Sequence, residues 1–369
     1  MKRAITRAGV LRASVFFAIL IVIPLAGGPV WLLNLLIFTV MYAALSSSWN
    51  ILGGYAGYPS LGHVAFFGIG AYTIGILFSN GVGNGYLPFV VLPVVGVAVA
   101  LFSLPIGWIS MRTRTDVFAI VTITILFIAQ TLAFNLTNVT GGAQGKSVAP
   151  APFAVDTYDW PFYFAMVALL AVAMGISFYI SRSKIGLSLA TVRADEDKAH
   201  GVGVRVTAVK LIAFAVSCGL VAMVGGVWAY YVGFIYPQFA IDPLITIGMV
   251  LMAFLGGRGT LWGPVLGAFI LVPAQELFAQ SFGASELYLL AYAAVFLVIM
   301  LFLPRGIIPS VRERLNKKRA AAAGAARDAA ALAERPASSD NVDAVGARMP
   351  ASASASSASA SEVKATVTR

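Results

Sequence analysis

The chain has 369 residues, of which 59% are hydrophobic and 11% are charged, and its mean hydropathy is +0.88. Soluble domains carry about 25% charged residues, and apolar stretches here reach about 20 residues, which together exclude a soluble enzyme, a secreted disulfide scaffold and an outer-membrane barrel. The net charge of +10 does not indicate nucleic-acid binding, because the basic residues separate apolar segments. A single cysteine, Cys218, excludes an intrachain disulfide.

Ten apolar segments predict an all-α, polytopic integral membrane protein with about ten transmembrane helices. The segments are 14–27, 30–50, 60–79, 87–110, 117–137, 161–181, 209–235, 243–257, 260–279 and 287–303. The stretches 50–62 and 243–279 are rich in glycine, so we expect broken or re-entrant helices there, covered by protein or by a watery cavity.

The positions of lysine and arginine predict the orientation. With a cytoplasmic N-terminus and ten spans, only Lys146 of the 25 basic residues falls on the outer side. We therefore expect both termini in the cytoplasm. Cleavage of the first segment, which resembles a secretory signal, is the less favoured alternative and would leave nine spans.

This threading divides the chain into three parts. Residues 1–28 form a cytoplasmic start and first helix, residues 29–309 the transmembrane domain, and residues 310–369 a cytoplasmic, disordered tail rich in alanine and serine. Membrane lipid surrounds the second part. The basic run 312–319 is interpreted as ordinary anchoring at the membrane, with binding of anionic lipid as the alternative.

The first informative segment is 50–75, NILGGYAGYPSLGHVAFFGIGAYTIG. Its glycines and Pro59 favour a discontinuous helix beside a translocation pathway, and tight helix packing is an equal alternative. His63 is ionisable within a span, which makes it a functional candidate, although a neutral histidine hydrogen-bonded to the backbone is the somewhat favoured interpretation. The candidate pathway residues here are Gly54, Gly57, Ser60, Gly62, His63, Phe66, Gly68, Gly70 and Tyr72.

The predicted outer loop 138–160 contains TGGAQGKS at 140–147, which imitates a phosphate-binding loop. Threonine stands at position 140, where that loop requires glycine, and the segment faces away from cytoplasmic ATP. The sequence also lacks HExxH, GxSxG and paired carboxylates within its spans. We therefore predict a protein that is not an enzyme, binds no cofactor or metal, and relies on a partner if ATP drives it.

The cytoplasmic loop 182–208 is predicted to carry a short helix over 187–199, ended by Gly201 and Gly203. A helix of mixed charge between two spans favours docking of a cytoplasmic partner, and a merely solvated loop is the alternative. Its charged candidates are Arg193, Asp195, Glu196 and Asp197.

A second glycine-rich segment follows at 255–268, LGGRGTLWGPVLGA. Its similarity to the first segment is weak but fits the two related halves that transporters often contain. Its candidate pathway residues are Gly256, Gly257, Gly259 and Gly263.

In this order the segments resemble the permease subunits of bacterial branched-chain amino-acid ABC importers, specifically the M-type member of the H/M pair. The resemblance covers roughly 30–310 and rests on four ordered motifs. The matching residues include Asn50, Gly54-Tyr55-Ala56-Gly57, Ser60-Leu61-Gly62-His63, Gly70-Ala71-Tyr72, the external Thr140-Gly141-Gly142, Gly186, Ala190, Arg193, Glu196, Gly203, Lys210 and the run from Gly256 to Ala268. Pro59 replaces the family's usual glutamine, and RADED replaces RENE.

The resemblance implies a permease in the bacterial inner membrane that forms a pathway for branched-chain or other hydrophobic amino acids. It implies an extracytoplasmic solute-binding protein, a second (H-type) permease and two cytoplasmic ABC ATPases as partners. The ATPases would bind loop 182–208 through Gly186, Ala190, Arg193, Asp195, Glu196, Asp197, Gly201 and Gly203. Alternatives are a permease for urea, amides or aromatic acids, and a stand-alone secondary transporter or channel, which the scarcity of intramembrane acids disfavours.

Overall fold

The computed structural model of the chain describes residues 2–25, 29–79, 81, 85–282, 294, 297, 306–317 and 324. Its internal contacts divide the chain into Met1–Leu315 and Asn316–Arg369. Only the first unit is described at any length, so the fold below is the fold of that unit.

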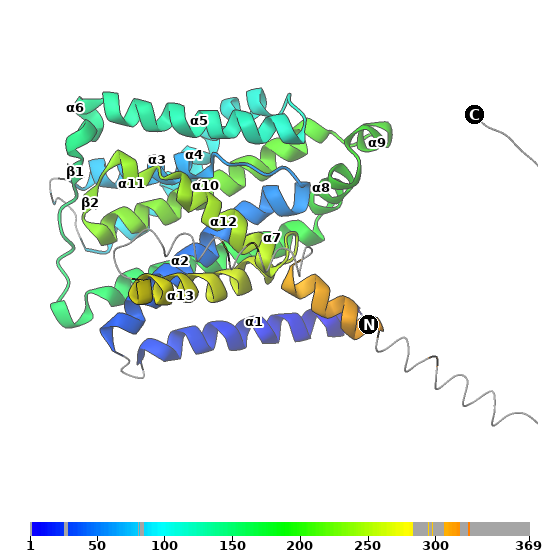
Figure 1. Cartoon of the computed structure of the whole chain (residues 1–369), viewed down its shortest axis with the longest axis horizontal. Coiled ribbons are helices and arrows are strands. Elements are labelled where there is room, and N and C mark those ends of the chain that lie inside the picture. The colour runs from blue at the N-terminus through cyan, green and yellow to red at the C-terminus, as the bar shows by residue number, and fades with distance from the viewer. Residues whose placement is uncertain are drawn as a thin grey trace, which may run out of the picture. The chain divides into compact units, whose positions relative to one another are not determined.

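The first unit is almost entirely helical, as predicted, and its long helices run side by side along roughly one direction (Figure 1). The elements are α1 (Lys2–Leu25), α2 (Val30–Asn50), the π-helix η1 (Ile51–Ala56), α3 (His63–Leu77), α4 (Leu87–Ser110), α5 (Thr115–Asn135), α6 (Thr137–Thr140), η2 (Gly142–Gln144), β1 (Lys146–Ser147), η3 (Val155–Thr157), α7 (Asp159–Arg182), α8 (Lys184–Ala194), α9 (Glu196–Gly201), α10 (Val206–Val232), β2 (Phe234–Ile235), α11 (Pro237–Ala240), α12 (Pro243–Gly256) and α13 (Gly263–Phe282). Helical residues 307–315 follow.

Six helical stretches of the described chain are long and apolar enough to cross a membrane. They are Val30–Ala56, Leu87–Ser110, Thr115–Asn135, Val155–Arg182, Val206–Val232 and Pro237–Gly256. The shorter apolar stretches Leu11–Leu25 and His63–Leu77, together with α13, match three further predicted segments. The tenth predicted segment, 287–303, lies almost wholly outside the described residues.

Helix α10 is the centre of the bundle. Of the six long apolar stretches it is the most buried, at 72%, and it packs against α2, α3 and α4. Its contact with α3 depends on glycine: a Cβ at Gly70 would meet the carbonyl oxygen of Ala222, and a Cβ at Gly225 would meet that of Phe67. The two backbones therefore approach more closely than larger residues allow.

Helices α4 and α5 are the least buried spans, at 28% and 22%. The large exposed side chains of α4 are all apolar, among them Val90, Val94, Leu101 and Ile109. Exposing such an apolar surface to water is unfavourable, whereas exposing it to hydrocarbon is not. This face therefore suits contact with lipid or with another membrane-embedded chain.

Both glycine-rich segments leave α-helical geometry, as predicted. After α2 the chain passes through η1 and the non-helical residues 57–62, and between α12 and α13 it passes through residues 257–262. We call residues 51–62 the first glycine segment and residues 257–262 the second glycine segment. Each connects two helices rather than interrupting the middle of one.

The end of the bundle away from α8 and α9 holds loop 138–160, which contains α6, η2, β1 and η3. Its strand β1 pairs antiparallel with β2, Lys146 opposite Ile235, so the loop is fastened to the end of α10. The segment that imitates a phosphate-binding loop is a packed turn here: the hydroxyl of buried Thr140 shares its one proton between the carbonyl oxygens of Ala133, at 2.6 Å, and Leu136, at 2.9 Å.

The prediction of one short helix over 187–199 was wrong, because the chain breaks into α8 and α9 at Asp195. The backbone of Asp195 is extended, and its carboxylate accepts a hydrogen bond of 3.0 Å from the amide of Lys198. Aspartate is a preferred N-cap residue, so it begins a new helix there. The predicted helix end at Gly201 agrees with α9, and Gly203 follows with a φ of +82°.

Candidate functional site

Three segments that are far apart in the sequence meet at one end of the bundle: the two glycine segments and the helices α8 and α9. The side chain of Asn50, the last residue of α2 and the residue directly before the first glycine segment, binds the second glycine segment. Its Nδ2 donates to the carbonyl oxygen of Thr260 at 3.0 Å, and its Oδ1 accepts from the amide of Gly259 at 2.8 Å. One amide side chain thus holds both a backbone carbonyl, of Thr260, and a backbone amide, of Gly259, in the second segment.

Arg193 of α8 reaches into this junction. Its Nη1 donates to the carbonyl oxygen of Gly54 at 2.7 Å. Its stem lies on Gly57, where a Cβ would come within 2.9 Å of the Arg193 Cγ, and its guanidinium lies where a Cβ of Gly259 would be. Gly57 and Gly259 have φ values of +78° and +76°, which favour glycine on conformational grounds as well.

The charge of Arg193 is only partly solvated. Partial burial lowers the pKa of its guanidinium, and the nearby positive charge of Arg258 lowers it further. Arg258 itself lies over the ring of Phe254, 5.0 Å from its centroid. Two like charges therefore converge on the second glycine segment, where each raises the electrostatic cost of holding the other.

Glu196 of α9 makes the second connection between the loop and the bundle. Its Oε1 accepts from the Nζ of Lys210 at 2.6 Å, and its Oε2 accepts from the hydroxyl of Tyr58. Lys210 is only 1% exposed, and its ammonium lies 4.2 Å from the ring centroid of Tyr58. Burial raises the pKa of Glu196, but the hydrogen bonds from Lys210 and Tyr58 outweigh that effect and lower it below its ordinary value.

His63 lies at the start of α3 and is fully buried. Its Nε2 is 2.7 Å from the hydroxyl of Ser217, and that hydroxyl donates to the carbonyl oxygen of Ser48 at 2.7 Å. Since the Ser217 proton is already used, the histidine Nε2 must be the donor. The other ring nitrogen, Nδ1, has no hydrogen-bond partner within the described part of the chain.

The remaining candidate pathway residues of α3 are not gathered at this junction. Gly68 and Gly70 face Ile241 and Ala222, and Phe66 packs edge-on against Phe214. Gly62, the last residue of the first glycine segment, faces the backbone of Thr122, and Tyr72 of α3 is buried. In this chain they occupy contacts between helices, and their role in a pathway stays a prediction.

The other candidates divide by position. Gly256, Gly257 and Gly263 lie close together where α12 turns into α13. Ser60 is buried, and its carbonyl oxygen accepts from Trp49 at 2.7 Å. Gly186 packs tightly against the end of α7. The exposed candidates of the loop are Ala190, Arg193, Asp197, Gly201 and Gly203, although the guanidinium of Arg193 bonds to the Gly54 carbonyl.

Two groups of residues at this site had no role predicted from the sequence. Tyr58 and Lys210 complete the charge cluster around Glu196, and a lone lysine at the start of an apolar segment was the available signal. Leu187 and Val202 are 72% and 73% exposed on the loop. Large apolar side chains on a charged loop are a signal for contact with a partner.

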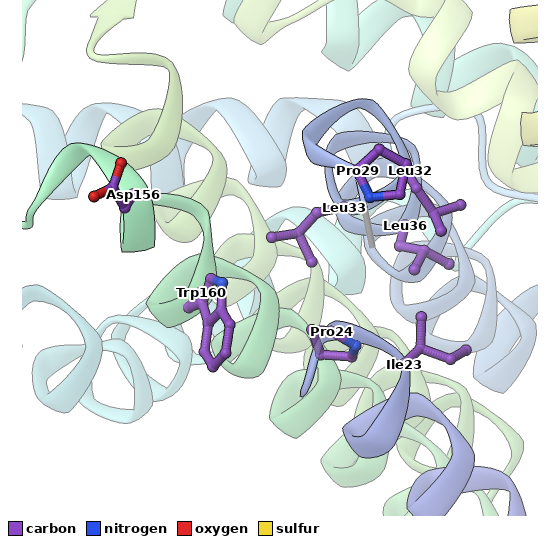
Figure 2. A pocket seen from close by; sticks show the side chains of 8 residues that line it. All are labelled: Ile23, Pro24, Pro29, Leu32, Leu33, Leu36, Asp156 and Trp160. Atoms are coloured by element: carbon purple, nitrogen blue, oxygen red, sulfur yellow. The ribbon is translucent and has the colours of Figure 1, made fainter. Parts of the chain in front are cut away.

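Two cavities are lined by described residues, one away from this junction and one beside the second glycine segment. One, of about 210 Å³, lies at the opposite end between the end of α1, the start of α2 and the start of α7, and is lined by Asp156 and Trp160 together with proline, leucine and isoleucine side chains (Figure 2). The other, of about 380 Å³, lies between α1, α7 and Trp262. None of the predicted pathway residues lines either cavity.

These features define a multi-pass membrane protein with helices joined by glycine segments beneath a charged loop. The family described as "Branched-chain amino acid transport system / permease component" matches residues 31–303, and the chain belongs to this family.

Among its relatives are the high-affinity branched-chain amino acid transport system permease proteins LivM of Escherichia coli (strain K12) and of Salmonella typhimurium. They are 28% and 29% identical to the chain over 316 residues, which cover 78% of this chain and 72% of each relative. The autoinducer 2 import system permease protein LsrC of Yersinia pseudotuberculosis is 29% identical over 37% of this chain and 38% of its own length. No solved structure matches the chain.

Proposed function

We propose that this permease forms part of the translocation pathway of an ATP-driven importer for branched-chain or other hydrophobic amino acids. The pathway is shared with a second permease, an extracytoplasmic solute-binding protein delivers the substrate, and two cytoplasmic ATPases supply the energy. The names of the LivM relatives support this substrate class. They do not favour urea, amides, aromatic acids or a stand-alone channel.

One observation carries the energy-coupling part of the proposal. The loop of α8 and α9 touches both glycine segments with its inner side and presents Leu187, Ala190, Asp197 and Val202 on its outer side. A surface that joins exposed apolar and charged side chains suits a protein partner. Because the sequence carries no phosphate-binding loop of the required pattern, that partner is proposed to be the ATPase.

The charges of the loop support its placement on the cytoplasmic side of the inner membrane, together with both termini. The opposite end, with β1, β2 and the 138–160 loop, is then the side where the solute-binding protein docks. The division of the chain into residues 1–28, 29–309 and 310–369 belongs to the same proposal.

The test is co-purification of the ATPases with the tagged chain, expressed from its native operon context in gentle detergent. Replacing Leu187 by aspartate should weaken the ATPase contact at least about tenfold, as expected for a buried interface anchor. The matched control is Val155→Asp, because Val155 is 92% exposed at the opposite end. Full ATPase recovery and normal leucine uptake by Leu187→Asp would place the docking surface elsewhere.

A further inference from the structure

We propose that Arg193 and Glu196 are positioning residues, whose contacts with the bundle carry movement of the α8–α9 loop into both glycine segments, although Arg193 is also partly exposed to solvent. The inference rests on the proposed function, because it assigns the coupling route of the same site. The loop would bind the ATPase with its outer face and displace the helix connections with its inner face.

The Arg193 contact reaches both glycine segments at once. Its guanidinium donates to the Gly54 carbonyl of the first segment, 2.7 Å away, and lies against Gly259 of the second. Asn50, directly before the first segment, already bonds to Gly259 and Thr260 of the second. A shift of α8 therefore acts on both segments together through the Arg193 side chain. Arg193 lies 139 positions after Gly54 in the sequence.

The Glu196 contact supplies a second, independent point of attachment. Its carboxylate binds Tyr58 of the first glycine segment and Lys210 at the base of α10. Lys210 is 1% exposed, so this pair lies inside the protein on its lysine side. Two separated contacts fix the orientation of the loop, whereas one contact would act only as a hinge.

The inner and outer sides of the α8–α9 loop carry different apolar side chains. On the inner side, Leu189, Val192 and Ala199 of the loop are buried, at 0%, 4% and 0% exposure. On the outer side, Leu187 and Val202 project into solvent. Docking and coupling are thus assigned to different side chains of the same short helices. This separation allows the two roles to be tested separately.

The experiment uses the complete importer in proteoliposomes, with the variants Arg193→Gln, Arg193→Lys and Tyr58→Phe. Arg205→Gln is the matched control, since it removes an exposed positive charge from the same loop.

For Arg193→Gln we expect ATPase content and basal hydrolysis within twofold of the unaltered importer. We expect hydrolysis stimulated by the loaded binding protein, and leucine uptake, to fall at least tenfold. Tyr58→Phe should show a smaller loss of the same kind, and Arg193→Lys, which keeps a donor for the Gly54 carbonyl, should recover at least a third of the stimulated rate.

A second readout separates coupling from a merely structural role. With a single reporter cysteine at Pro59→Cys, ATP binding should change the thiol labelling rate in the unaltered importer and leave it unchanged in Arg193→Gln. The native Cys218 is buried and adds little background.

Two results would overturn the inference. Stimulated hydrolysis equal to that of the control in Arg193→Gln would remove the coupling role, and loss of the ATPase from this variant would make Arg193 a docking residue. If the unaltered chain binds no ATPase at all, the proposed function itself fails, and the inference fails with it.

Discussion

A lysine buried to 1% exposure needs a compensating charge, and in this chain Glu196 supplies it. Removing one partner of a buried ion pair leaves the other charge without compensation, which costs about 3–5 kcal/mol when both are fully buried. The Glu196 side chain is 31% exposed, so solvent screens part of this interaction. The stabilisation is correspondingly smaller than for a fully buried pair.

Replacing Glu196 by glutamine should therefore lower the free energy of unfolding by about 1–3 kcal/mol, after that reduction for exposure. Unfolding in mixed micelles of increasing SDS content measures it. The matched control is Asp197→Asn on the same helix, where an exposed carboxylate should matter by less than about 0.5 kcal/mol. Equal effects of the two substitutions would mean that the ion pair does not stabilise the loop.

The same carboxylate predicts how the loop responds to acid. Its pKa in the folded chain lies below the ordinary value of 4.5, so its contribution is fully present above that value. It is lost as the pH falls through the lower folded value. Amide hydrogen exchange in α9 should therefore be constant from neutral pH to about 5 after correction for intrinsic rates, and should rise only in stronger acid. A rise already near pH 6 would contradict this assignment.

At this scale the sequence identified Arg193 and Glu196 as members of a charged loop but not the direction in which they point. Contacts across 139 and 138 positions decide that direction, and no local pattern encodes them. Tyr58 was recognisable only as an aromatic residue in a glycine-rich stretch, and Lys210 as a motif match at the edge of an apolar segment, with no role assigned to either.

At the scale of elements, glycine determines how closely helices pack. Gly70 and Gly225 lie where α3 crosses α10, each against a carbonyl oxygen of the other helix. A backbone atom cannot move aside as a flexible side chain does, so an added methyl group must push the helices apart. Gly175 of α7 is the contrasting case, because a Cβ there meets nothing within 4 Å.

We predict that Gly70→Ala lowers the free energy of unfolding by about 1–3 kcal/mol through overpacking. Gly175→Ala should leave it unchanged or raise it by up to about 1 kcal/mol, since alanine is the better helix former. The amount of folded chain recovered after heating in detergent ranks the two variants. A similar loss for both would show that helix propensity, rather than the crossing, controls the effect.

Most elements were predictable because apolar length alone distinguishes a spanning helix. The break at Asp195 was not predicted, although an aspartate three residues before Lys198 is a recognisable cap. The sequence left open whether the glycines of α3 line a pathway or pack helices. Neighbours such as Ala222 and Ile241 lie far along the chain, so only the fold reveals the packing.

For the whole molecule, the contacts give the bundle two distinct ends. One holds the charged loop and both glycine segments, and the other holds the paired strands β1 and β2. The proposed orientation places the first in the cytoplasm and the second outside, because nearly all basic residues then lie inside.

Cysteine labelling in intact cells tests this orientation. Lys146→Cys should react with a membrane-impermeant thiol reagent at once, and Lys198→Cys only after permeabilisation. The unaltered chain, with Cys218 buried, is the control and should stay unlabelled. Labelling in the reverse order would invert the proposed topology and remove the ATPase from the loop.

The short helix α3 also has a consequence for how the chain enters a membrane. Its 15 residues rise about 22 Å, less than the hydrocarbon thickness of about 30 Å. A helix of this length is a poor independent insertion signal, whereas α4, with 24 residues, is long enough to act as one. We expect the two to leave the translocon as a hairpin, so that α3 is committed to the bilayer only once its successor has been synthesised.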